Sequence, residues 1–282
     1  MKVVVTGAKG RAGRPLCQQL MNTHDVVAVD CVDPEIPGVA YVRTDLRVYR
    51  DVRRAVEGAE VVCHVAALHP WRKFTDRQYL DTNVKGTYWV LKAAQEAGVR
   101  RVVFVSTIWV LGHEGEPPGA PVPEDGPYHP NELYGLTKVM GEQACEFFSR
   151  KFGLQTIVLR PGGFGEREAL WTGPAKFATA YVDVRDVAHA IVCAATADVR
   201  HQLAAYWVAP RVPYQGDDWG LLASDPERLM EKHWPGAADW CRRHGLDIPR
   251  TRWAYSIERT ERELGYDPRY NFTEFLQEHA QE

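Results

Sequence analysis

The sequence lacks a long apolar run, paired cysteines and a strong excess of charge of either sign. No apolar stretch approaches the roughly 20 residues of a membrane-spanning helix, so we expect no membrane partner. The six cysteines include no C-x-x-C pair, which favours free thiols in a reducing compartment over disulfides or a metal site. A net charge of −3 gives no indication of a nucleic-acid partner.

The start of the chain also lacks the features of a secretory signal peptide. Met1 and Lys2 lead directly into a β-branched run, so we expect a cytoplasmic protein. Basic residues are scattered, and the doublets Arg53-Arg54 and Arg100-Arg101 are interpreted as solvated surface.

The segment Lys2–Thr6 predicts a buried strand that runs into a glycine-rich turn. Gly7, Gly10 and Gly13 follow three residues apart, and a helical pattern begins there. A strand, a glycine turn and a helix in this order place backbone N–H groups at a helix start, where a diphosphate can lie. The alternative is a merely tight turn, but the position at the first strand favours dinucleotide binding.

The second strand pattern ends in Asp30, about 20 residues past the glycines. Its carboxylate can accept hydrogen bonds from the adenosine ribose and would repel a 2′-phosphate, which favours NAD over NADP. Arg11 and Arg14 weigh slightly against this interpretation, because a basic side chain near the turn can pair with a phosphate, although both also fit a solvated surface. Asp45, after a third short strand pattern, is either an adenine contact or a helix N-cap, and both interpretations stay open.

Further strand patterns alternate with helical ones along the chain. A long helix is expected over 76–97, and His64 is interpreted as structural rather than catalytic. Strands are expected at 60–67, 101–105, 154–159 and 204–209, with a short strand at 181–186 leading into a helix at 187–195. This alternation predicts an α/β fold built on a doubly wound parallel sheet.

Tyr134 and Lys138 lie four residues apart, on one face of a helix predicted to run to about residue 152. A nearby ammonium favours the phenolate, so we expect it to lower the pKa of Tyr134 and to let the phenol act as a base. A second pair with the same spacing, Tyr88 and Lys92, lies deep in the 76–97 helix. Ser106 and Thr107 follow the 101–105 strand, at the end where parallel sheets bind ligands.

These motifs together resemble the extended short-chain dehydrogenase/reductase family, also called the NAD-dependent epimerase/dehydratase family. The matching segments, in chain order, are Thr6-Gly7-x-x-Gly10-x-x-Gly13, Asp30, Asp45-Leu46, His64-x-Ala66-Ala67, Asn83-x-x-Gly86-Thr87, Ser106-Thr107, Tyr134-x-x-x-Lys138, Leu159-Arg160-Pro161, Tyr181-Val182-Asp183-Val184-x-Asp186-Val187 and Leu264-Gly265-Tyr266-x-Pro268.

The resemblance implies that Thr107, Tyr134 and Lys138 are catalytic, and that Tyr88 and Lys92 only pack. It implies NAD as cofactor, bound by Gly7, Lys9, Gly10, Arg11, Gly13, Asp30, Asp45, Leu46, Ala66, Ala67, Asn83, Tyr134, Lys138, Pro161, Gly162 and Gly163. It further implies a Rossmann NAD-binding domain over 1–165 and 181–200, a small substrate lobe formed by 166–180 and 201–282, and a homodimer.

The family's reactions differ, and several residues bear on the choice. Ile108 and Trp109 follow Thr107 where sugar 4,6-dehydratases carry Asp-Glu, and the short segment 166–180 leaves little chain to hold a nucleotide. The chain is also similar to the uronate dehydrogenases of this family in its Leu-Tyr-Gly-Leu-x-Lys helix. We therefore expect an NAD-dependent oxidoreductase acting on a secondary alcohol or ketone of a small sugar-like substrate.

Two alternatives remain beside that expectation. One is a nucleotide-sugar epimerase or dehydratase that keeps NAD bound, and the other is a non-catalytic regulator, which the presence of the Thr-Tyr-Lys set disfavours. The resemblance makes Thr107 a substrate contact, and loop position alone adds the following candidates: His69, Trp71, Trp109, His113 and Arg167.

Overall fold

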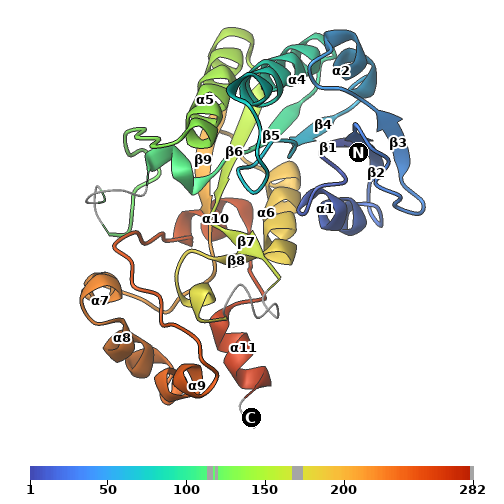
Figure 1. Cartoon of the computed structure of the whole chain (residues 1–282). Helices are drawn as coiled ribbons and strands as arrows, with labels where there is room; N and C mark the ends of the chain where they lie inside the picture. Colours follow the sequence, from blue (N-terminus) through green and yellow to red (C-terminus); the bar gives the residue numbers. More distant parts are fainter. Residues whose placement is uncertain (113–116, 118–119, 167–173, 280–282) are drawn as a thin grey trace.

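The computed structural model describes residues 1–112, 117, 120–166 and 174–279 (Figure 1). His113 and Arg167, two of the substrate candidates, therefore lie outside the described residues. Among the residues that the structure describes, no helix combines the length and apolar character needed to cross a membrane.

A seven-stranded sheet forms the centre of the upper part in Figure 1. Its strands, in spatial order, are β3 (Ala40–Arg43), β2 (Asp25–Asp30), β1 (Lys2–Thr6), β4 (Val61–His64), β5 (Arg101–Val105), β6 (Gln155–Pro161) and β9 (Leu203–Val208). Every neighbouring pair is parallel. The strand order reverses between β1 and β4, which confirms the predicted doubly wound Rossmann arrangement.

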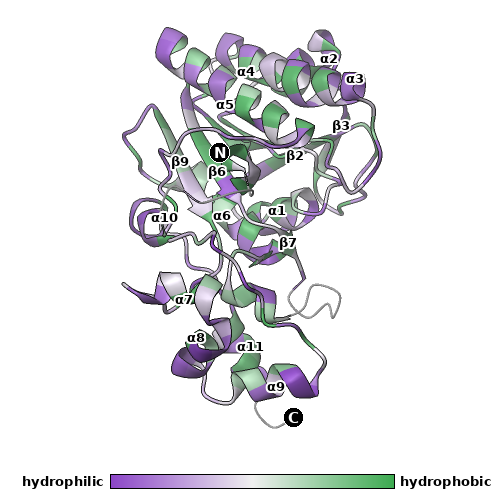
Figure 2. Ribbon diagram, turned by 60° about the vertical axis from the view of Figure 1, so that its left-hand side comes forward, coloured by the Kyte–Doolittle hydropathy of each residue, from purple (hydrophilic) through white to green (hydrophobic). Residues whose placement is uncertain are grey.

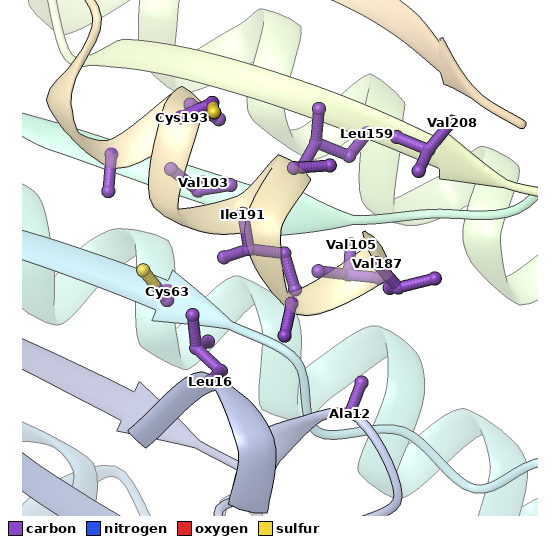
Figure 3. Packing of buried hydrophobic residues seen from close by; sticks show 14 of the residues in the cluster. Ala12, Leu16, Cys63, Val103, Val105, Leu159, Val187, Ile191, Cys193 and Val208 are labelled. Carbon is purple, nitrogen blue, oxygen red and sulfur yellow. The ribbon is translucent and has the colours of Figure 1, made fainter. Parts of the chain in front are cut away.

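Helices cover both faces of this sheet. On one face lie α1 (Gly13–Leu20) and α6 (Val184–Thr196), and on the other α2 (Tyr49–Ala55), α4 (Gly86–Glu96) and α5 (Leu133–Phe152). Side chains alternate between faces along a strand, so Val3 and Val5 join one buried cluster and Val4 joins the other. Figure 3 shows Leu16 of α1 and Ile191 of α6 in the first of these clusters.

The helix expected over 76–97 contains a π-helical turn. It consists of α3 (Asp76–Tyr79), the π-helical turn η1 (Leu80–Lys85) and α4, and it begins at Thr75, whose side chain forms a capping box with Gln78. The segment is helical as expected, but its hydrogen-bonding pattern changes from α-helical to π-helical over Leu80–Lys85. Such turns often occur at functional sites, and this one contains Asn83.

The helix expected at 187–195 begins earlier than its apolar pattern suggested. α6 starts at Val184 because the Asp183 carboxylate accepts the backbone N–H of Arg185 and caps the helix. The preceding strand is correspondingly short, with β8 (Val182–Asp183) paired to β7 (Phe164–Gly165) in a second, two-stranded sheet.

The stretch 201–282 divides between two cores, which corrects its assignment to the small lobe as a whole. β9 belongs to the main sheet, and Tyr255, Ile257, Leu264 and Tyr266 around α10 (Glu258–Leu264) pack in the main core. Helical propensity and pattern at 257–264 do not reveal which core a helix joins. The remaining division into two domains stays a prediction.

A separate core holds the small lobe together. It is formed by η4 (Pro174–Ala178), α7 (Asp218–Ser224), α8 (Pro226–His233), α9 (Ala237–Arg243) and α11 (Phe272–Glu278). Phe177, Trp234 and Phe272 are among its buried residues. In Figure 2, α8 and α9 show both purple hydrophilic and green hydrophobic parts, as expected for helices with one buried side.

Arg101 is buried, which corrects its interpretation as part of a solvated basic doublet. The side chain leaves only 2% of the residue exposed. Its guanidinium donates to the carbonyl oxygens of Ala194, Ala195 and Ala197 at the end of α6 and to the side chain of Gln155. These carbonyls have no partner within the helix, so Arg101 acts as the C-terminal cap of α6.

Candidate active site

The glycine-rich turn closes tightly against the neighbouring strand exit. Gly7 has φ +72°, and a Cβ there would lie 2.7 Å from the Cα of Ala66. A Cβ on Gly13 would lie 2.1 Å from the carbonyl oxygen of Gly7. Only glycine therefore allows this loop geometry. The turn ends at the start of α1, which is the arrangement that a diphosphate requires.

Asp30 lies directly beside this turn. Its carboxylate accepts the backbone N–H of Lys9 over 3.0 Å and that of Val32 over 3.3 Å. The carboxylate is thus fixed at the carboxyl end of β2, next to the glycine loop. The donor and acceptor groups present here fit an adenosine diphosphate: backbone N–H groups for the phosphates and a carboxylate for the ribose hydroxyls.

Asp45 does not cap a helix, so that alternative is wrong. The N-cap of α2 is Val48, without a side-chain cap, whereas Asp45 accepts the backbone N–H of Arg47 over 2.9 Å and pairs with its guanidinium at 2.6 Å. The hydrogen bonds from Arg47 lower the pKa of Asp45. A hollow of about 400 Å³ next to it is also lined by Cys31 and Thr44. An adenine contact for Asp45 stays a prediction.

Other residues predicted to hold the cofactor pack closely against neighbouring segments of the chain. A Cβ on Gly162, which follows Pro161 at the end of β6, would lie 1.8 Å from the carbonyl oxygen of Ala180, and one on Gly163 would lie 2.7 Å from the ring of Tyr181. Both glycines therefore permit close packing of this loop. In the same way, Leu46 approaches Gly86 so closely that an added Cβ would lie 3.1 Å away.

Tyr134 and Lys138 extend from the first two turns of α5 toward the end of β5. The Lys138 ammonium, on a residue 3% exposed, donates to the carbonyl oxygen of Val105 over 2.7 Å and lies 5.8 Å from the centre of the Tyr134 ring. Thr107 follows β5 by two residues. The strand end and the helix start thus bring the predicted Thr-Tyr-Lys set into one region.

The second Tyr-Lys pair lies elsewhere. Tyr88, on α4, is 40% exposed. The ammonium of Lys92 pairs with Glu96 at 2.7 Å. This pair is surface structure, in agreement with the interpretation that it takes no part in the site.

Within the chain itself, Lys138 does not lower the pKa of Tyr134, contrary to expectation. Burial raises the pKa of Tyr134 above its usual range, with smaller contributions from the charge of Glu132 and from Tyr79. Burial also lowers the pKa of Lys138 to about 8, opposed in part by Glu142. A dry site disfavours both charged forms, and the ammonium is already bound to a carbonyl.

Two hydroxyl groups in this region have no acceptor among the described residues. Tyr134 and Thr107 are each 7% exposed. The Thr107 oxygen accepts the backbone N–H of Trp109 over 3.3 Å, but its own hydrogen, like that of Tyr134, has no acceptor in the described parts of the chain. Thr107 Oγ1 is bonded and the Tyr134 oxygen is not among the buried side-chain atoms left without a partner, so it is accessible from outside. Both hydroxyls can therefore donate to a ligand.

Aromatic rings from three segments meet beside these hydroxyls. The ring centre of His69 lies 4.7 Å from that of Tyr134 and 5.8 Å from that of Trp109. Trp71 lies 4.2 Å from His69, and the guanidinium of Arg11 stacks on Trp71 at 3.9 Å. The structure therefore brings three of the substrate candidates together with Tyr134, and it links them to the glycine-rich turn.

Asn83 was predicted to hold the cofactor, and the structure gives it a positioning role. Its amide accepts the backbone N–H of Leu68 over 2.8 Å and donates to the carbonyl of Leu68 over 3.0 Å. The other amide hydrogen goes to Thr137 on α5. Asn83 thus fixes the exit loop of β4, which contains Ala66 and Ala67, and both of its N–H groups are used within the chain.

Sequence reasoning missed a buried polar cluster behind the site. Glu142 accepts hydrogen bonds from Ser106 over 2.5 Å and from Tyr128 over 2.9 Å, and it pairs with Arg160 at 2.6 Å. The one available signal is the position of Glu142, four residues after Lys138 and thus on the same helix face. Its partners come from distant segments, so the pairing itself has no local signature.

The doubly wound sheet, the glycine-rich turn with Asp30 beside it, and a buried Tyr-Lys-Thr set together define a dinucleotide-dependent enzyme of the oxidoreductase type. A family model described as the NAD dependent epimerase/dehydratase family matches residues 3–168. The chain belongs to this family, which confirms the predicted family, the enzyme class and NAD as the cofactor.

Individual relatives differ in how much of the chain they match. A uronate dehydrogenase from Pseudomonas putida is 26% identical over 57% of this chain and 60% of its own length. An L-arabinose 1-dehydrogenase (NAD(P)(+)) from Haloferax volcanii is 28% identical over 96% of this chain and 97% of its own.

A solved structure confirms the fold independently. A short-chain dehydrogenase/reductase superfamily protein from Agrobacterium tumefaciens, crystallised with bound NAD, has a TM-score of 0.78. It is 22% identical and matches over 99% of this chain and 96% of its own. At 22% identity, this structural similarity supports the fold only.

Proposed function

We propose that this protein is an NAD-dependent dehydrogenase that oxidises a secondary alcohol of a small cyclic sugar. The observation that carries the proposal is the pair of hydroxyls of Thr107 and Tyr134, which have no acceptors among the described residues, together with the Lys138 ammonium 5.8 Å from the Tyr134 ring centre. The relative that matches along nearly the whole chain acts, by its name, on carbon 1 of L-arabinose, and this supports carbon 1 of an aldose or uronate as the reacting position.

Each residue then has a separate task. The Thr107 hydroxyl orients the reacting oxygen of the substrate, and the Tyr134 oxygen takes the proton of that alcohol. Lys138, which does not lower the pKa of Tyr134 within the chain, would bind the ribose of the nicotinamide. NAD, when bound, accepts the hydride from the same carbon. The aromatic rings of His69 and Trp109, which contact the Tyr134 ring, shield one side of it from water.

The glycine-rich turn and Asp30 would hold the cofactor. Backbone N–H groups at the start of α1 would donate hydrogen bonds to the diphosphate, and the Asp30 carboxylate would accept hydrogen bonds from the ribose hydroxyls. Because that carboxylate would repel a 2′-phosphate, we propose a preference for NAD over NADP.

The test is a panel of free aldoses, free uronates and nucleotide sugars, each supplied with NAD. We expect NADH absorbance to rise with a free sugar, and NMR of the product to show oxidation at carbon 1. Conversion of a nucleotide sugar to its epimer without accumulation of NADH would instead establish the epimerase alternative and overturn the proposal.

We also propose that the protein works as a homodimer in the cytoplasm, in carbohydrate metabolism. Leu136, Met140 and Phe147 of α5 and Tyr88 of α4 are between 38% and 45% exposed, an apolar set on adjacent helices that self-association would bury. All six cysteines are free, which suits a reducing compartment. Light scattering should give twice the chain mass, and Leu136→Glu with Met140→Glu should give a monomer; a monomeric wild type would refute the dimer.

A further inference from the structure

His69 is held rigidly at the edge of the candidate site. Asn83 binds both the N–H and the carbonyl of the preceding residue, Leu68, so the backbone cannot shift freely there. The His69 ring lies between Trp71 at 4.2 Å and Tyr134 at 4.7 Å, with Trp109 at 5.8 Å. A side chain fixed in this way is suited to specific recognition.

The hydrogen bonds of His69 define which ring nitrogen carries the proton. The backbone N–H of Trp71 points at Nδ1 of His69 over 3.4 Å, so Nδ1 is the acceptor and the hydrogen is on Nε2. Burial, reinforced by the charges of Lys138 and Arg11, lowers the pKa of His69 to about 4, so the ring is neutral at neutral pH. No described residue accepts a hydrogen bond from Nε2.

The site thus presents three hydrogen-bonding groups without an acceptor among the described residues: the hydroxyls of Thr107 and Tyr134 and the Nε2–H of His69. The two hydroxyls are both needed at the reacting oxygen. A third donor, placed against the Tyr134 ring, is left for a different oxygen of the same substrate. Binding sites for small molecules in general combine apolar walls with a few placed polar groups that fix orientation.

We propose that His69 is a substrate-binding residue whose Nε2–H donates to the hydroxyl on the carbon next to the reacting one. The site therefore selects cyclic sugars with a vicinal hydroxyl, and for an aldose oxidised at carbon 1 this is the 2-hydroxyl. The inference rests on the proposed function for the identity of the reacting carbon and adds the recognition of its neighbour.

Two substitutions separate the donor from the ring. His69→Phe keeps an aromatic ring between Trp71 and Tyr134 but has no donor, whereas His69→Gln keeps a donor of similar reach. With L-arabinose, we expect His69→Phe to raise KM about tenfold and His69→Gln to stay within about threefold of wild type. Equal losses in both variants, or none in His69→Phe, would overturn the proposal.

The 2-deoxy analogue of L-arabinose tests the position of the contact. Because it lacks the oxygen assigned to His69, wild type and His69→Phe should differ less than about threefold on it. A full tenfold difference on the deoxy sugar would show that His69 meets another group, contrary to the proposal.

Binding measured without turnover keeps this test separate from that of the oxidation. Saturation-transfer NMR of L-arabinose with the NAD-loaded protein should show binding to wild type that His69→Phe weakens and His69→Gln retains. This result together with no NADH formation would refute the proposed function and still support His69. Unchanged binding in His69→Phe, or no binding to wild type, would overturn the role of His69.

Discussion

Asn83 donates a hydrogen bond to Thr137, with 3.2 Å between Nδ2 and Oγ1, and so joins the π-helical turn η1 to helix α5. The hydroxyl of Thr137 in turn donates to the carbonyl of Tyr134 over 2.7 Å. The rest of the Asn83 amide holds Leu68, next to His69. One buried side chain therefore sets the spacing between the exit loop of β4 and the helix start that carries Tyr134.

Asn83→Ala should harm both stability and activity. It leaves the partly buried backbone groups of Leu68 without their partner, so the free energy of unfolding should fall by about 2–4 kcal/mol. Because His69 and Tyr134 would lose their common support, kcat/KM should fall about tenfold or more. Urea unfolding and steady-state kinetics at a temperature where the variant is folded measure the two effects.

Thr137→Val is the matched control for this prediction. It removes one of the three side-chain hydrogen bonds of Asn83 and the bond to the Tyr134 carbonyl, but it leaves those to Leu68 intact, so it should cost less on both measures. A variant Asn83→Ala that loses stability but keeps the kcat/KM of wild type would show that the site does not depend on this link.

Tyr134→Phe should abolish most turnover without releasing the cofactor. The substitution removes the Tyr134 oxygen, which is proposed to accept the proton of the substrate alcohol, so kcat should fall about 10²–10⁴-fold. Binding of NAD, followed by fluorescence titration, should change little because the ring and the Lys138 ammonium remain. The surface pair supplies the control: Tyr88→Phe removes a hydroxyl at the same spacing from a lysine and should leave kcat unchanged. Retained turnover in Tyr134→Phe would disprove the assigned role.

The sequence could predict those parts of the fold and site that depend on residues close to one another along the chain. The β1 segment, the three glycines and Asp30 follow one another within one βαβ unit, so their spacing alone predicts a nucleotide site. The helix that places Tyr134 and Lys138 on one face could also be predicted from neighbouring residues. What separates this pair from Tyr88 and Lys92 is the position of each helix relative to a strand end, and that required the resemblance to a family.

Features that arise from packing between distant segments could not be predicted. Arg101 has the sequence context of a surface residue, yet its partners are carbonyls at the end of α6. The π-helical turn around Asn83 has no distinguishing apolar period. The expected fall in the pKa of Tyr134 failed for a related reason: spacing gives the position of Lys138, but the dryness of the site and the carbonyl of Val105 come from the fold.

Asp30 should control the choice between the two nicotinamide cofactors. In Asp30→Ser the repulsion of a 2′-phosphate disappears, so the ratio of kcat/KM for NAD to that for NADP should fall by about tenfold or more. Asp33→Ser removes an equal charge three positions along the chain and should leave the ratio near that of wild type. A ratio unchanged in Asp30→Ser would place the adenosine ribose away from β2.

His64 should make the stability of the protein depend on pH below neutrality. Thr87 donates its only hydrogen to the carbonyl of Asn83, so it must accept from Nε2 of His64, and Nδ1 then accepts from Thr6 over 2.7 Å. This arrangement admits only a neutral ring, and burial, followed by the charge of Lys138, lowers the pKa of His64 to about 3.

The unfolded chain, with an ordinary histidine pKa of about 6.5, binds this proton more readily than the folded one. The contribution of His64 is therefore complete above pH 6.5 and falls by about 1.4 kcal/mol per pH unit as the pH drops toward 3. Urea unfolding between pH 7 and pH 5 should show a shallower decline in His64→Gln than in wild type, even if the variant is less stable at pH 7. His129→Gln, at an exposed position, should keep the wild-type slope. If the free energy of unfolding fell equally with pH in wild type and His64→Gln, His64 would not be held neutral. The hydrogen bonds that link Thr6, His64, Thr87 and Asn83 would then not run in the direction assigned to them.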